Sequence, residues 1–278
     1  MLKEAVSHER WKESPPFQPF VTRYADSYQE FQMSWNPYCI KKDALFYQFA
    51  TGREDTEIEL VSDACLNVLF ELDKSDPQAL FSGTFLQPET LALKPDTTYF
   101  GFKPYSNLGF KPSRICLRDM VDYHTDFTEA YPDARMLISE MAEAASFSDR
   151  IYIFTRFAWD HLVDHTYTPT FVDYLAVILC TSPGDIVFNN IEQVIGYSER
   201  YCREKFKDCY GISPKQYSDI IRFQNTLKAL VFGHCKDLSS LAIESGYYDQ
   251  SHLTHDFRRY TNEPPGKYLE KHATLLKA

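Results

Sequence analysis

A cluster of polar and basic side chains near the end of the chain has the residue types and spacing needed to recognise a nucleic acid. The cluster consists of Gln250, Ser251, His252, Thr254, His255, Arg258 and Arg259. Such side chains hydrogen-bond to base edges or to phosphates. Leu253, Phe257 and Tyr260 are interleaved with them, which predicts a helix that buries one face and exposes the polar set.

A second, more acidic cluster lies upstream, in a diverged copy of the same segment. It consists of Glu199, Arg200, Arg203, Glu204 and Lys207. With one residue of slippage after the first glycine, four landmarks coincide: Gly196 with Gly246, Phe206 with Phe257, Pro214 with Pro265, and Tyr217 with Tyr268. The sequence therefore contains a tandem repeat.

Each copy has the order of elements found in a helix-turn-helix: a short apolar helix, a glycine turn and a second helix. The first helices are DIVFNNIEQVIGY and DLSSLAIESGY. Glycine suits a tight turn because it adopts positive φ without strain. Ser198 and Asp249 stand where the next helix must begin, and their oxygens can cap its free N–H groups.

The segment between the copies, PKQYSDIIRFQNTLKALVFG, has apolar residues at helical spacing. About 16 residues of helix span roughly 24 Å. This length predicts a rigid connection that separates two DNA-binding units by about one turn of DNA, roughly 34 Å.

The region from about Phe171 to Leu269 resembles the DNA-binding domain of the AraC/XylS family of bacterial transcription regulators. The matching residues of the first copy are Ser198, Arg200, Tyr201, Phe206, Lys207, Gly211, Ser213 and Pro214. Those of the connecting helix and second copy are 222–224, 227–230, 241–242, Gly246, 249–253, 257–260 and Pro265. The resemblance implies two units that enter successive major grooves of double-stranded promoter DNA. Activation by contact with RNA polymerase is the commoner behaviour of the family, and repression also occurs.

We assign base-edge contacts to Arg200, Arg203, Gln250, His252 and His255. The side chains expected nearer the phosphates are Lys207, Arg258 and Arg259. The first unit departs from the family pattern at Glu192, Glu204 and Lys205, and the second has Asn262 in place of the usual turn glycine. Base reading by the first unit is therefore an open question.

The chain from Phe17 to Leu117 shows strand-like runs, CLNVLFEL, ALFYQFA, TTYFGFKPY and SRICL, bounded by Gly, Pro, Asp and Ser. From Asp119 to Thr166 the period becomes helical, with Met136, Ile138, Met141 and Ala145 expected near one face. In the AraC/XylS family such an N-terminal domain is often a cupin-like barrel that senses an effector, with helices that form a homodimer. No ligand-binding residue is assigned.

The charge of the chain is unevenly distributed. Residues 1–180 contain 16 basic and 27 acidic residues, a net charge of −11, whereas residues 181–278 contain 13 and 12, a net charge of +1. Phosphate neutralisation drives non-specific binding, so this balance argues against a general nucleic-acid coat protein and is compatible with a site-specific one. No apolar run approaches 18 residues and the N-terminus lacks a signal-peptide core, which predicts a cytoplasmic protein with no membrane partner, nucleoid-associated when bound.

Enzyme and metal chemistry are disfavoured. The barrel region has no histidine between Trp11 and Asp122 to serve as a metal-cupin ligand. Asp63, Cys65 and His124 could form a hydrolytic set, but nothing in their spacing requires one. The spacing of His161 and His165 could place a metal on one face of a helix, but it is more typical of an exposed polar helix. The seven cysteines are scattered without CxxC spacing, which is typical of reduced structural thiols. We therefore expect no catalytic residue, no metal and no cofactor.

The predicted fold class is α+β, with a β-rich, cupin-like N-terminal domain at residues 1–168 and an all-α domain at residues 169–278. The second domain holds two helix-turn-helix units joined by a long helix. The predicted function is a sequence-specific transcription regulator, an activator controlled by a small molecule or by dimerisation. The alternative is a protein-interaction regulator that acts through a partner with little direct DNA binding.

Overall fold

The computed structural model describes residues 17–19, 25–35, 42–105, 109–111, 113–181, 195–232 and 237–272. Its N-terminal part contains two antiparallel sheets. The larger sheet has the strand order β1-β2-β7-β4-β5-β8 and the smaller pairs β3 with β6. The strands are β1 Ala25–Trp35, β2 Lys42–Thr51, β3 Thr56–Leu60, β4 Asn67–Glu71, β5 Gln78–Ser82, β6 Glu89–Leu93, β7 Thr98–Pro104 and β8 His124–Asp126.

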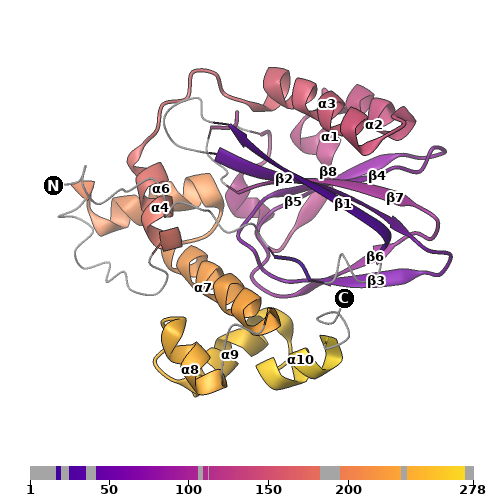
Figure 1. Cartoon of the computed structure of the whole chain (residues 1–278). Helices are drawn as coiled ribbons and strands as arrows, with labels where there is room; N and C mark the ends of the chain where they lie inside the picture. Colours follow the sequence, from indigo (N-terminus) through magenta and orange to yellow (C-terminus); the bar gives the residue numbers. More distant parts are fainter. Residues whose placement is uncertain are drawn as a thin grey trace.

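Both faces of the larger sheet are covered by apolar side chains. On one face, Phe46, Phe70 and Phe100 pack with Phe154 of the overlying helices. On the other, Leu69 and Tyr99 pack with Ile58 of β3. The alternating run at 65–72 is therefore a strand, as predicted, and it is buried on both sides because helices cover one face and the smaller sheet the other (Figure 1).

Helices α1 Phe127–Ala130, α2 Ala134–Glu143 and α3 Phe147–Phe157 lie over the larger sheet, and α3 continues into a π-helical turn at Ala158–Leu162. The buried face of α2 contains Leu137, Ile138 and Met141. The placement of Met136 and Ala145 on this face was wrong: Met136 is 75% exposed, because the 3.6-residue period starting at Ala134 excludes it.

The run SRICL was wrongly predicted as a strand. Residues 113–116 lie outside any strand and a 3₁₀ turn, η1, covers Leu117–Met120. Its apolar side chains Ile115 and Leu117 pack against the sheet-and-helix core instead of pairing with a strand. Short apolar runs do not distinguish a strand from a packed turn.

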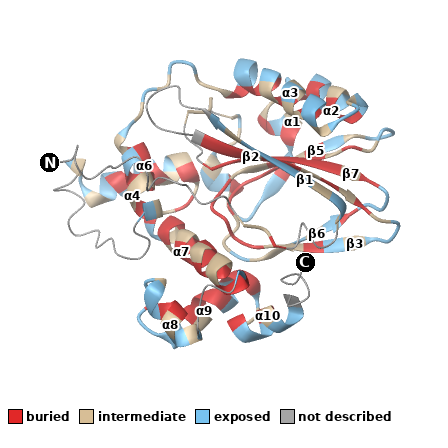
Figure 2. Cartoon of the chain, in the orientation of Figure 1, coloured by how far each residue is buried: buried red, intermediate tan, exposed pale blue. Residues whose placement is uncertain are grey.

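The C-terminal part is entirely helical among the described residues. Its helices are α4 Phe171–Thr181, α6 Glu199–Tyr210, α7 Pro214–Val231, α8 Leu238–Glu244, α9 Gln250–Thr261 and α10 Pro265–His272. Helix α7 runs through the middle of this part with most of its side chains buried (Figure 2). The predicted fold class, a β-rich N-terminal part followed by an all-α part, is confirmed. The boundary at residues 168 and 169 stays a prediction, and none of the described helices is both long and apolar enough to cross a membrane.

Candidate nucleic-acid interface

The second helix-turn-helix unit comprises α8 and α9. Asp237 caps α8 by accepting from the backbone N–H groups of Ser239 and Ser240. Gly246 turns the chain at φ +77°, and Asp249 then caps α9 by accepting from the N–H of His252 at 2.7 Å. The turn and the cap lie at the residues that the sequence predicted.

The inner face of α9 is anchored to α7. Leu253, Phe257 and Tyr260 are buried, and the rings of Phe257 and Tyr260 lie 5.5 Å and 4.8 Å from that of Phe223. These contacts fix the rotation of α9 about its own axis. Its polar side chains therefore face outward.

Arg222 of α7 adds a buried polar anchor to the same unit. Its guanidinium is 2.9 Å from Asp256 and 3.1 Å from Asp219, and it lies 4.4 Å from the ring of Tyr247. Burial lowers the pKa of Arg222, but the nearby Tyr247 and the two carboxylates outweigh burial and raise it. A permanently charged Arg222 thus holds α7, the turn and α9 together.

Six of the predicted contact residues of the second unit line one open, shallow depression on α9. They are Gln250, Ser251, Thr254, His255, Arg258 and Arg259. We call this set the α9 face. His252 is exposed but lies outside the depression, with its ring 5.3 Å from that of Tyr247. Within the face, the Gln250 carbonyl accepts from the Thr254 hydroxyl at 2.8 Å and the Gln250 amide oxygen from Ser239 at 2.8 Å.

The first unit repeats this geometry around α6. Gly196 has φ +78°, Ser198 caps α6 by accepting from the N–H of Tyr201, and Cys202 and Phe206 are fully buried. A second open depression on the outer side is lined by Ser198, Glu199, Arg200, Arg203 and Glu204. We call this outer side of α6 the α6 face. Lys207 is half-buried and lies outside the depression. Most of the predicted first helix of this unit, including Glu192, lies outside the described residues.

The α6 face carries more acidic groups than the α9 face, and they are engaged within the molecule. Arg203 pairs with Glu199 one turn away. Arg118 of η1 reaches α6 and lies 3.0 Å from Glu204 and 2.7 Å from Asp208. Sequence analysis missed Arg118, because Arg118 and Glu204 are separated by 86 residues and no local pattern links them.

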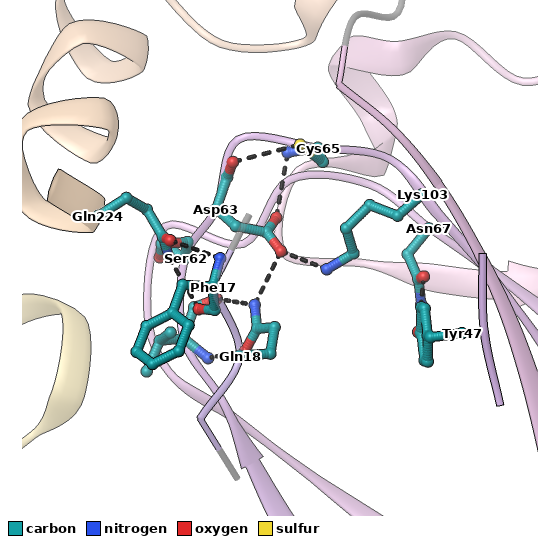
Figure 3. Close-up of polar contacts among 10 residues, drawn as sticks. Phe17, Gln18, Tyr47, Ser62, Asp63, Cys65, Asn67, Lys103 and Gln224 are labelled. Carbon is teal, nitrogen blue, oxygen red and sulfur yellow. Dashed lines mark hydrogen bonds and ion pairs between the residues drawn. The ribbon is translucent and has the colours of Figure 1, made fainter. Parts of the chain in front are cut away.

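Helix α7 joins the two units and is docked on the N-terminal part. Its start carries the capping box of Ser213 and Gln216, with Pro214 in the first turn. Gln224 accepts from the N–H of Phe17 at 2.9 Å and donates to the Ser62 carbonyl at 2.7 Å (Figure 3). The connecting helix is therefore in contact with the β-rich part.

A cavity of about 410 Å³ lies where the β-rich part meets the end of α7. Its polar lining includes Tyr28, Tyr47, Asn67, Lys103, Tyr105 and Lys228. Lys103 and Asp63 form a buried ion pair at its wall, and Gln18 donates to Asp63 at 2.8 Å (Figure 3). Burial lowers the pKa of Lys103 but the Asp63 carboxylate raises it overall, whereas burial lowers the pKa of Lys228 to about 8.

The other residues considered for chemistry do not assemble into a metal site or a hydrolytic set. His161 lies 3.3 Å from Asp133, and a ring nitrogen of His165 lies 2.8 Å from the Trp159 carbonyl. His124 pairs with Glu89 at 3.2 Å. In the part of the chain that the structure describes, no group of three or more His, Cys, Asp or Glu could hold a metal ion.

Residues 191–271 match a family model described as a helix-turn-helix domain, and no curated protein matches the chain. Among solved structures, ToxT from Vibrio cholerae is 11% identical, with 88% of this chain and 98% of that chain covered and a TM-score of 0.43. A DNA-binding transcriptional dual regulator from Escherichia coli K-12 is 20% identical, with 37% and 99% covered and a TM-score of 0.32. CdpR from Pseudomonas aeruginosa is 14% identical, with 64% and 47% covered and a TM-score of 0.33.

The family match rests on sequence. It covers the glycine turns, the caps and the second helix of each unit, α6 and α9, which we call the outer helices. Residues 191–271 of this chain therefore form a helix-turn-helix domain, the kind of domain that the resemblance to the AraC/XylS family predicted.

Proposed function

We propose that this protein regulates transcription by binding specific double-stranded DNA through α9 and α6. The observation that carries the proposal is the α9 face, on which six side chains able to contact DNA point away from a well-anchored helix. Their donors suit base edges and phosphates in the major groove. Such a regulator works in the cytoplasm, on the nucleoid.

The experiment is site selection from random duplex DNA with the purified full chain, followed by binding to genomic promoters. We expect one enriched motif, and we expect Gln250→Ala combined with Arg258→Ala to abolish the enrichment. Lys74→Ala is the matched control, since Lys74 is an exposed cation in the turn between β4 and β5. Failure of the unaltered chain to enrich any sequence would contradict the proposal and favour a regulator that acts through a protein partner.

We further propose that the cavity beside α7 holds a small-molecule effector. Its wall combines residues of the β-rich part with Lys228 and Phe232 of the helix that joins the two units and the turn after it. A molecule bound there contacts both parts of the protein. Its binding can therefore shift the equilibrium between different arrangements of the two parts. Activation, contact with RNA polymerase and homodimer formation stay predictions from the family resemblance.

A screen of small metabolites by thermal unfolding tests the effector site. A true effector raises the unfolding midpoint of the full chain and changes its affinity for the selected DNA. Leu45→Trp, which fills the cavity, should remove both effects, whereas Leu91→Trp, a partly buried leucine of β6 outside the cavity lining, should keep them. Persistence of both effects in Leu45→Trp would place the effector elsewhere.

A further inference from the structure

The contact between η1 and α6 is a specific docking of the β-rich part onto the outer helix of the first unit. The Arg118 guanidinium donates to the Glu204 carbonyl and carboxylate, both at 3.0 Å, and pairs with Asp208 at 2.7 Å. At the end of α6, a Cβ added to Gly211 would lie 2.5 Å from the Leu117 carbonyl. The backbone of η1 therefore lies against the C-terminal half of α6.

The internal repeat shows which face of α6 this contact occupies. Phe206 and Phe257 are equivalent at an offset of 51 residues, and the same offset relates Glu204 to His255 and Asp208 to Arg259. His255 and Arg259 belong to the α9 face. Arg118 is therefore bound to the two positions of the first unit that correspond to the DNA-facing side of the second.

The charge at one of these positions is opposite in the two units, and at the other the first unit has Glu204 where the second has His255. The second unit has a basic residue on its own helix at Arg259, whereas the first has Asp208 with the cation of Arg118 bound to it. The Glu204 and Asp208 side chains are about half exposed, at 53% and 48%. Without Arg118, Asp208 would keep its longer pair with Lys205 at 3.6 Å, and the remaining negative charge at this site would repel DNA phosphates.

We propose that Arg118, a residue of the β-rich part, belongs to the DNA-binding surface of the first unit, where together with Lys205 it compensates the charges of Glu204 and Asp208. This inference rests on the proposed function. The β-rich part would then contribute directly to DNA binding. Its Arg118 would provide at α6 the positive charge that Arg259 provides on α9.

The test compares the full chain with Arg118→Ala on the selected DNA. We expect the variant to bind about three- to tenfold more weakly at about 50 mM salt, and the deficit to shrink at about 200 mM, because salt screens exposed charges. Arg156→Ala is the matched control, since Arg156 is an exposed arginine paired with Glu140 between α2 and α3. It should bind as the unaltered chain does.

A second variant separates charge neutralisation from other roles of Arg118. Adding Glu204→Gln and Asp208→Asn to Arg118→Ala should restore the affinity, because no carboxylate then needs a cation. Unchanged or tighter binding by Arg118→Ala, the latter expected if η1 obstructs α6, would overturn the inference, and so would failure of the triple variant to regain affinity with an unchanged unfolding midpoint. Absence of DNA binding by the unaltered chain would instead refute the proposed function and this inference with it.

Discussion

The second unit presents Arg258 and Arg259 on α9, and neither forms an ion pair with another residue that the structure describes. The first unit presents Arg203 paired with Glu199, and Glu204 and Asp208 paired with Arg118. The two units share turns, caps and a buried aromatic face. One backbone arrangement thus supports two kinds of outer helix surface: that of α9 has arginines without ion pairs among the described residues, and that of α6 has charges paired within the protein.

The largest expected effect concerns the two arginines of the second unit. Replacing Arg258 and Arg259 together with alanine should weaken DNA binding about 100-fold and lower the salt slope by about two, because each phosphate contact contributes about one to that slope. Fluorescence anisotropy with labelled duplex at several salt concentrations measures both quantities. A slope unchanged from that of the Lys74→Ala control would show that these arginines do not meet phosphates.

The buried Arg222 anchor is a further difference between the two units, since the position equivalent to Asp256 in the first unit is the exposed Lys205, which lies 3.6 Å from Asp208. Arg222→Ala should lower the free energy of unfolding by about 2–3 kcal/mol, because it leaves Asp256 largely buried beside an empty site. Lys205→Ala should change it by less than about 0.5 kcal/mol. Urea unfolding measures both, and equal effects would mean that the two units are anchored alike.

Replacing Lys228 of α7 tests whether the helix that joins the two units influences the difference in charge pairing between α6 and α9. Its pKa of about 8 lies below the ordinary 10.5, so between these values the unfolded chain binds more protons and stability rises with pH. Below pH 8 the group is charged in both states and the cost of burial is fully present. Lys228→Met should therefore stabilise the protein at pH 7 by about 1–2 kcal/mol after allowance for solvent screening.

The stabilisation by Lys228→Met should vanish above about pH 10.5. The weakening of DNA binding caused by Arg118→Ala or by Arg258→Ala should be the same with and without Lys228→Met. Urea unfolding at a series of pH values checks the first expectation. A stabilisation that does not depend on pH would contradict the role assigned to burial.

The smallest expected effect concerns the helix ends. Gly211 and Asn262 are equivalent and both have positive φ, +77° and +59°. Gly211→Ala should cost about 1–2 kcal/mol, because alanine is strained there and meets η1, whereas Asn262→Gly should change stability by less than about 1 kcal/mol. Thermal unfolding compares them, and a harmless Gly211→Ala would show that η1 can move away from α6.

Much of the C-terminal part follows from local chemistry. Gly196 and Gly246 mark the turns, Ser198 and Asp249 cap the next helices, and the burial of Phe206 and Phe257 follows from helical periodicity. The β-rich part was less predictable: the run TEIEL of β3 and the helix α10 were not singled out, and SRICL was assigned to the wrong element. Short strands depend on partners distant in sequence, which no local pattern encodes.

The tandem repeat, the caps and the polar outer sides of α6 and α9 could be predicted from the sequence. Each depends on residues within a few helical turns of one another. The docking of Gln224 of α7 on the β-rich part and the position of Arg118 beside the acidic side of α6 could be seen only in the folded structure. These contacts join residues brought together by packing of the whole chain. Their energies depend on distance and burial, which spacing along the sequence does not specify.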